Sequence, residues 1–121
     1  MYSITEVSEQ LGIKAHTLRY YEKEGIIEPD RNSYGVRKYK DSHVTWLKFV
    51  KKLRETEMPI AQIKEYVKLV QEGDHTTLER LHLLEDHRSY IRNQIQELKE
   101  TEEMLDKKVR TYKEWIVKQG S

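Results

Sequence analysis

Basic, hydroxyl and aromatic side chains gather in two short stretches within the N-terminal third of the sequence. The first stretch contains Lys14, His16, Thr17, Arg19 and Tyr20, and the second contains Arg31, Tyr34, Arg37 and Tyr39. A guanidinium group can donate two parallel hydrogen bonds to a guanine edge or to a phosphate. Lysine, threonine and tyrosine side chains can hold further phosphate oxygens. These residue types therefore favour binding to the backbone and base edges of a nucleic acid.

Catalytic and metal-binding chemistry has weaker support. The sequence has five histidines, but no serine–histidine–aspartate set or carboxylate pair stands out from its many charged residues. A possible metal patch would draw on His75, His82, His87, Glu79, Glu85 and Asp86. Only the pairs of His82 with these carboxylates, and Glu79 with Asp86, share a helical face. We therefore expect a solvated charged surface there, with no metal, no cofactor and no enzymatic activity.

Composition limits the other possibilities. The 121 residues are 36% hydrophobic and 36% charged with a net charge of +1, so DNA binding would depend on the local placement of charge. No cysteine is present, which excludes disulfides and thiolate chemistry within this sequence. The first residues lack the pattern of a signal peptide, and no apolar run approaches the roughly 20 residues of a membrane span. We expect a cytoplasmic protein with no membrane partner.

The first basic stretch falls on the second of two predicted helices. Ser3 and Glu6 form a capping-box pattern at the start of a helix over residues 3–11, and Gly12 suits its end. A second helix follows over residues 15–24. Two helices joined through about three residues form a helix-turn-helix, although an ordinary helical hairpin has the same spacing.

The second basic stretch falls on a predicted β-hairpin over residues 29–39, with its turn near 32–35. A hairpin beside a helix-turn-helix is a wing, and its tip can rest on the DNA backbone. Asp41 or Ser42 then caps a third helix, and Pro59 fits the first turn of a fourth. The apolar stripe of that fourth helix consists of Ile60, Ile63, Val67 and Val70.

A heptad pattern dominates the sequence from about Thr76 onward, with steps of four and three residues. Its apolar positions are Leu84, Ile91, Ile95, Leu98, Leu105, Val109, Tyr112 and Ile116. A helix over 84–116 extends roughly 50 Å and needs a partner helix to cover this stripe. Arg88 and Glu102 interrupt the stripe and could set the register of an antiparallel pair. The sequence therefore predicts a DNA-binding domain over 1–73 and a coiled-coil dimerisation helix with a short tail over 74–121.

An ordered set of residues spans the predicted helix-turn-helix and wing. It consists of the run TLRYYE at 17–22, followed by Gly25, Pro29, Arg31, Gly35, Arg37 and Tyr39. With this set, the sequence from Thr5 to Val70 resembles the MerR family of bacterial transcription regulators. The stretch that begins at Met58 is similar to a short branch of the family that responds to aldehyde or thiol stress. The resemblance implies a mainly α-helical fold: a winged helix-turn-helix and a long helix that pairs antiparallel in a homodimer.

The resemblance also implies partners and roles. Double-stranded promoter DNA is the implied partner, RNA polymerase is a second one, and the small-molecule effector is unknown. The second helix would lie in the major groove, although a solvated surface is an equal alternative for His16. Tyr34, Arg37 and Tyr39 match wing positions that touch phosphates, with packing beneath the wing as the alternative for Tyr39. Such a homodimer binds a specific sequence and bends and untwists the promoter.

Three departures from the family concern how a signal would be sensed. Metal-sensing members use cysteines, and drug-sensing members append an effector domain, whereas here five residues follow Ile116. The aldehyde-responsive branch carries a cysteine in the third-helix region, where this sequence has Val50-Lys51-Lys52-Leu53. A different signal, action without an effector, and a truncated tail all remain open. The competing function is a coiled-coil adaptor for another protein, which would leave the basic hairpin unexplained.

Overall fold

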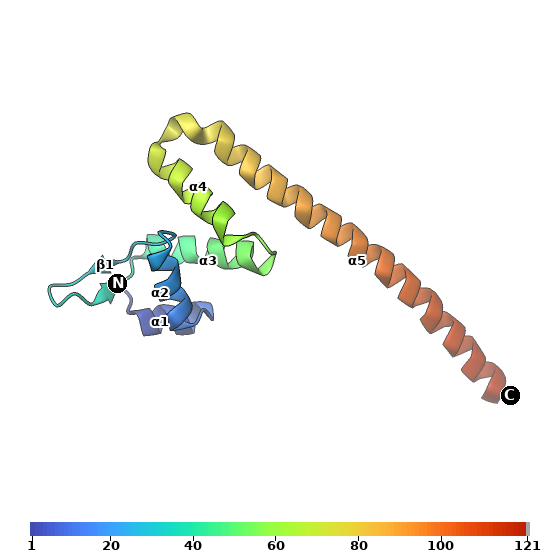
Figure 1. Ribbon diagram of the computed structural model, residues 1–121. Coiled ribbons are helices and arrows are strands. Elements are labelled where there is room, and N and C mark those ends of the chain that lie inside the picture. The colour runs from blue at the N-terminus through green and yellow to red at the C-terminus, as the bar shows by residue number, and fades with distance from the viewer. Residues whose placement is uncertain (121) are drawn as a thin grey trace. The chain divides into compact units, whose positions relative to one another are not determined.

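A computed structural model describes residues 1–120 and is mainly α-helical (Figure 1). In chain order its elements are α1 (Ile4–Leu11), α2 (Ala15–Lys23), β1 (Asp30–Arg31), β2 (Arg37–Lys38), α3 (Asp41–Glu55), α4 (Ile60–Glu72), the short 3-10 helix η1 (Asp74–Thr76) and α5 (Thr77–Gly120). The chain divides into two compact units. The first, Met1–Leu83, is called the head below, and the second begins at Leu84. The predicted fold class, a winged helix-turn-helix with a long C-terminal helix, is confirmed.

The predicted capping box fixes the start of α1. The backbone N–H of Glu6 donates to Ser3 Oγ at 3.1 Å, and the backbone N–H of Ser3 donates to Glu6 Oε1 at 3.0 Å. These two bonds satisfy amide donors that the first turn of a helix leaves unpaired. At the other end Gly12 takes a left-handed conformation with φ of 66° and donates to the carbonyl of Ser8. The chain thus turns sharply into α2 after only two further residues.

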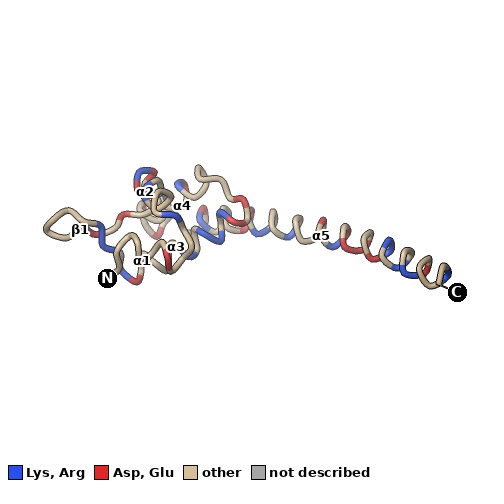
Figure 2. The backbone as a smooth tube through the Cα atoms, turned by 90° about the horizontal axis from the view of Figure 1, so that it is seen from below, with Lys and Arg blue, Asp and Glu red and all other residues tan. Residues whose placement is uncertain are grey.

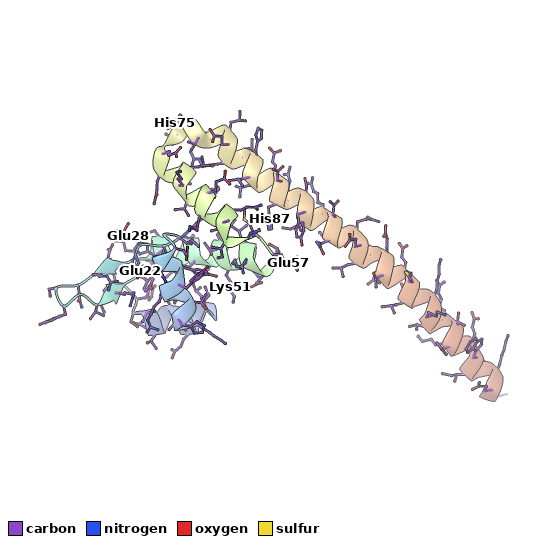
Figure 3. All side chains as sticks on the ribbon, viewed as in Figure 1. Glu22, Glu28, Lys51, Glu57, His75 and His87 are labelled. Atoms are coloured by element: carbon purple, nitrogen blue, oxygen red, sulfur yellow. The ribbon has the colours of Figure 1, made fainter. Side chains whose placement is uncertain are left out.

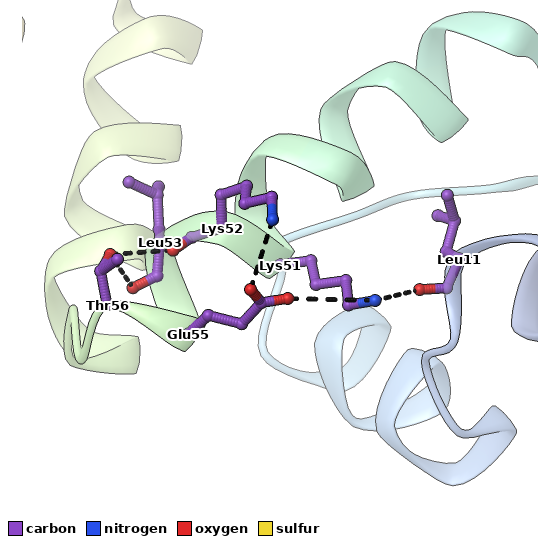
Figure 4. Close-up of polar contacts among 6 residues, drawn as sticks. All are labelled: Leu11, Lys51, Lys52, Leu53, Glu55 and Thr56. Atoms are coloured by element: carbon purple, nitrogen blue, oxygen red, sulfur yellow. Dashed lines mark hydrogen bonds and ion pairs between the residues drawn. The ribbon is translucent and has the colours of Figure 1, made fainter.

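A lysine from α3 holds this turn from the other side. Lys51 Nζ donates to the Leu11 carbonyl at 2.5 Å and lies 3.9 Å from a carboxylate oxygen of Glu55 (Figure 4). The ammonium group therefore caps the last turn of α1, where carbonyls lack helical partners and the helix dipole is negative. A Cβ at Gly12 would lie 3.2 Å from the same Nζ. The joint between α1 and α2 is consequently fixed by a residue far away in the sequence.

The core of the head is formed by apolar residues of α1, α2, α3 and α4 and of the segments between them. Its fully or nearly fully buried members include Val7, Leu18, Leu47, Val50, Met58 and Ile63. Burying an aliphatic side chain contributes roughly 1.5–3 kcal/mol. Trp46 adds a polar link, because its indole Nε1 donates to the Ile26 carbonyl at 2.8 Å. This bond fixes the segment that follows α2 against α3.

The starts of α3 and α4 correct two sequence predictions. Neither Asp41 nor Ser42 caps α3: the cap position is Lys40, whose backbone N–H donates to His43 Nδ1 at 2.9 Å. The imidazole nitrogen thus takes the place that a glutamate or glutamine side chain has at the third helical position of a capping box. Pro59 occupies the cap position directly before α4, one residue earlier than predicted.

The predicted apolar stripe of α4 was wrong at its C-terminal end. Val70 is 45% exposed, whereas Leu69 is buried. Next to this position, η1 is tied to α4 because the Thr76 hydroxyl donates to the Leu69 carbonyl at 2.6 Å. The compact head extends to Leu83, which is partly buried against the core. The functional boundary after residue 73 remains a prediction.

Helix α5 is continuous from Thr77 to Gly120 and begins earlier than the predicted 84–116 helix. Of its described residues only His87 is buried. The predicted dimerisation residues that lie exposed are Ile95, Leu98, Leu105, Val109 and Tyr112, while Leu84 and Ile91 are partly buried. Within residues 1–120, no helix is both long enough and apolar enough to cross a membrane.

Candidate nucleic-acid interface

Helix α2 separates its side chains into a buried apolar face and an exposed polar face. Leu18 and Tyr21 are buried in the core. Of the predicted DNA-binding residues, Lys14, His16, Arg19 and Tyr20 are exposed and Thr17 is partly exposed. A helix that turns a polar and basic face outward has the form needed to enter the major groove and reach base edges.

The predicted hairpin is present, with Asp30 paired to Lys38 and Arg31 paired to Arg37 in an antiparallel ladder. Its tip is closed by Asn32, whose side-chain oxygen accepts the backbone N–H groups of Tyr34 and Val36 at 2.9 and 3.0 Å. Gly35 has a φ of 77°, a conformation that favours glycine. The tip is therefore ordered by its own hydrogen bonds.

Tyr34 lies at this tip and is 89% exposed. Figure 2 shows that the tip carries no charged residue, since the tube between the two strands is tan. A phosphate contact by the tip would thus use the Tyr34 hydroxyl or backbone amides rather than a basic side chain. The phosphate contact of Tyr34 stays a prediction, for which its hydroxyl is accessible.

Arg31 and Arg37 are held by a carboxylate from α2. Arg31 donates through an Nη atom to Glu22 Oε2 at 2.7 Å, and Arg37 Nε donates to Glu22 Oε1 at 2.6 Å. Arg31 also donates to the Gly35 carbonyl at 2.9 Å. Both guanidinium groups therefore connect the wing to α2, which the sequence reasoning missed. Glu22 belongs to the TLRYYE run, but nothing in the linear spacing indicates that it meets residues nine and fifteen positions away.

Tyr39 corrects a predicted DNA contact. Its side chain has no exposed surface, and its backbone pairs with Tyr2 through two hydrogen bonds of 2.8 Å. Among the described residues, its hydroxyl has no hydrogen-bond partner. Burial raises the pKa of Tyr39. The alternative reading, packing beneath the wing, is the correct one, because the residue after β2 points into the core.

The suggested histidine–carboxylate patch does not converge. Among residues 1–120, no three histidine or carboxylate side chains are placed to hold a metal ion. Along α5, acidic and basic residues alternate, as the red and blue segments of Figure 2 show. The charged side chains of this helix thus form a mixed surface.

Two helices across a short glycine-containing joint, with a hairpin bonded to the second helix, define a winged helix-turn-helix protein. The family described as MerR HTH family regulatory protein matches residues 2–69, and a second family description, MerR, DNA binding, matches residues 44–108. The chain belongs to the MerR family, whose members are DNA-binding transcription regulators.

Curated relatives agree with this assignment. An HTH-type transcriptional regulator of Haemophilus influenzae is 36% identical over 112 residues, which cover 92% of this chain and 83% of the relative. The HTH-type transcriptional regulator AdhR of Bacillus subtilis is 38% identical over 90 residues, which cover 74% of this chain and 64% of AdhR. The chain therefore spans most of the first relative and somewhat less than two thirds of the second.

Solved structures agree as well. A MerR family transcriptional regulator from Listeria monocytogenes superposes with a TM-score of 0.87 at 35% identity, covering 93% of this chain and 86% of that one. HiNmlR, described as a MerR family regulator lacking the sensor domain and bound to promoter DNA, superposes with a TM-score of 0.85 at 35% identity. That match covers 93% of this chain and 90% of HiNmlR.

Proposed function

We propose that this MerR-type regulator binds a specific promoter sequence as a homodimer, with α2 in the major groove and the hairpin tip on the flanking backbone. The observation that carries the proposal is the exposed polar face of α2, bonded through Glu22 to a hairpin whose tip exposes Tyr34. The structural neighbour HiNmlR, solved bound to promoter DNA, supports promoter DNA as the partner.

Roles follow from position on α2. Arg19 is exposed and reads a guanine or grips a phosphate with its guanidinium group. Lys14 and Thr17 at the N-terminal end of the helix, and Tyr20 through its hydroxyl, hold the backbone and fix the register. His16 is also exposed on this face and would lie over the same groove. Arg31 and Arg37 add positive charge at the wing.

The exposed apolar stripe of α5 is the reason to propose that a second copy of the chain pairs with this helix. Leu98 and Leu105 are 68% and 59% exposed, although leucine at successive heptad positions is typical of a covered seam. In an antiparallel pair, Arg88 of one copy would face Glu102 of the other and set the register. Pairing would place two α2 helices on successive turns of one DNA face. Bending and untwisting the promoter costs on the order of 1–6 kcal/mol, which contacts from both heads would offset.

The test is an electrophoretic mobility shift with the DNA upstream of the protein's own gene. We expect a specific shift that weakens as salt rises, because counterions are released from the phosphates. Arg19→Ala should weaken specific binding by about 10-fold or more. Lys108→Ala on α5 removes the same charge far along the chain from α2 and should leave the shift unchanged. Equal binding by wild type and Arg19→Ala would contradict the assignment of α2.

A coiled-coil adaptor is the second candidate function. It is favoured by apolar residues of α5 that lie outside the heptad seam, since Met104 and Val117 are 70% and 71% exposed. Absence of any DNA shift even at low salt would favour the adaptor. As a promoter-binding protein, the chain would act by binding rather than catalysis, in the bacterial cytoplasm where promoter DNA lies.

A further inference from the structure

The two strands of the wing bring like charges face to face. Arg31 and Arg37 are direct partners in the antiparallel ladder, so their side chains emerge on the same side of the hairpin. Like charges at directly opposite positions destabilise a strand pair. The carboxylate of Glu22 removes this repulsion, because each of its oxygens accepts a hydrogen bond from one arginine, at 2.7 and 2.6 Å.

The wing is also too small to be stable without contacts to the rest of the head. Each strand has two residues, and an isolated two-stranded hairpin is marginally stable at best even when longer. At its base, the backbone pair of Tyr39 with Tyr2 ties the hairpin to the N-terminal segment. The two arginine bonds to Glu22 tie it to α2. Figure 3 labels Glu22 on this helix. The second tie connects the wing to the helix that we propose enters the groove.

The Glu22 carboxylate is partly buried between the two arginines, and these arginines favour its charged form. Its side chain is 24% exposed, and the side chain of Arg37 is 26% exposed. Partial burial acts to raise the pKa of Glu22, but the hydrogen bonds and charges of Arg37 and Arg31 outweigh it and hold the pKa below its ordinary value. Charge-assisted bonds of this length are among the stronger ones in proteins.

We infer that Glu22 is a positioning residue for DNA recognition, which clamps Arg31 and Arg37 and so fixes the wing relative to α2. The inference rests on the proposed function, because the fixed geometry matters only where helix and wing bind one duplex together. Base readout by α2 and a backbone contact by Tyr34 must be satisfied at the same time. A clamp that holds their separation reduces the ordering that binding would otherwise require.

Positioning of the wing by Glu22 and simple neutralisation of the arginines predict different effects on DNA affinity. If Glu22 only neutralised the arginines, its removal would add one positive charge to the head and strengthen binding to every DNA sequence. If Glu22 positions the wing, its removal lowers specific affinity relative to non-specific affinity. The ratio of the two affinities therefore separates positioning from neutralisation.

Three variants of the full chain test this. Glu22→Gln removes the charge, and Glu22→Asp keeps it but shortens the reach to two arginines. Glu24→Gln is the matched control, because Glu24 is also a carboxylate at the end of α2, bonded to Lys64 at 2.8 Å instead of to the wing. Affinity for the upstream promoter fragment and for a scrambled duplex is measured at several salt concentrations. Thermal melts by circular dichroism establish that each variant is folded.

We expect the ratio of specific to non-specific affinity to fall about tenfold in Glu22→Gln and Glu22→Asp, the size of one lost bond to a charged group. Glu24→Gln should keep the wild-type ratio. An unchanged ratio in both Glu22 variants, or an equal fall in Glu24→Gln, would overturn the inference.

Amide hydrogen exchange in the DNA-free protein tests the clamp by itself. The amides of Tyr34 and Val36 should exchange faster in Glu22→Gln than in Glu24→Gln, because the wing loses its tie to α2. Equal exchange rates would overturn the clamp. A different result would separate the two ideas. If the wild-type protein does not bind DNA but the wing amides exchange faster in Glu22→Gln, the clamp exists and the proposed function is wrong.

Discussion

Leucines in the two units of this protein have opposite surroundings. Leu47 in the head has no exposed surface, whereas Leu98 and Leu105 in α5 are 68% and 59% exposed. The head closes a core around its own residues, including Val7, Leu18 and Val50. A helix as long as α5 with an uncovered apolar stripe gains little from its own contacts, because most helical stability in proteins comes from packing. The difference teaches that the head covers its apolar residues by its own packing, whereas α5 leaves an apolar stripe exposed that the proposed homodimer would cover.

The largest expected effect comes from charging the stripe of α5. The double variant Leu98→Glu and Leu105→Glu should abolish dimerisation, because it would bury four like charges in each pair of helices. Specific DNA affinity should then fall about 100-fold or more, since two linked heads bind far more tightly than one. Sedimentation analysis measures the oligomeric state and a mobility shift measures the affinity.

The matched control places the same two charges on the opposite face of the helix. Asn93→Glu and Gln96→Glu lie outside the heptad positions, so this variant should remain dimeric. A dimeric Leu98→Glu, Leu105→Glu variant would show that the seam lies elsewhere.

The second-largest expected effect comes from replacing a leucine with alanine in each unit and comparing the losses of stability. Leu47→Ala should lower the free energy of unfolding of the head by about 2–5 kcal/mol, because it leaves a cavity in a closed core. Leu105→Ala should instead lower stability in a way that depends on protein concentration, as expected where a partner covers the side chain. Urea denaturation at several concentrations distinguishes the two. A concentration-independent loss in Leu105→Ala would argue against pairing.

A smaller effect concerns the clamp at acid pH. The pKa of Glu22 in the folded protein is below its ordinary value of 4.5, so the clamp adds stability above that pH and loses it as the pH falls through the lowered pKa. Since Arg31 is 44% exposed, solvent limits the contribution to about 1 kcal/mol. The unfolding free energies of wild type and Glu22→Gln should therefore differ near neutral pH and converge in acid. A constant difference across the titration would contradict this.

The smallest expected effect concerns Tyr39, which was predicted to contact DNA but is buried. Tyr39→Phe should leave DNA affinity unchanged, because the ring is fully buried. It should leave stability unchanged or raise it by up to about 1 kcal/mol, since it removes a buried hydroxyl without a partner among the described residues. Thermal melts and mobility shifts measure both. Weaker DNA binding with unchanged stability would restore a role for the hydroxyl at the interface.

Local signals in the sequence determined most of the secondary structure. Ser3 with Glu6 predicted the start of α1, Gly12 its end, and the turn around Asn32 and Gly35 the hairpin, because capping and turn chemistry acts over a few residues. The heptad steps predicted the long helix, because apolar residues at steps of four and three share one helical face. The family resemblance placed Arg19 and Tyr20 on the DNA-facing side of α2, and both side chains are exposed.

Only the tertiary structure decided which distant residues meet. Tyr39 is buried, Glu22 holds Arg31 and Arg37, and Lys51 caps the end of α1. Each of these contacts joins residues that no local pattern relates, since their separation depends on how α2, the hairpin and α3 pack. An arginine in a wing looks the same in sequence whether it faces a phosphate or a carboxylate. Packing places Glu22 between the two arginines, and this placement ties the wing to α2.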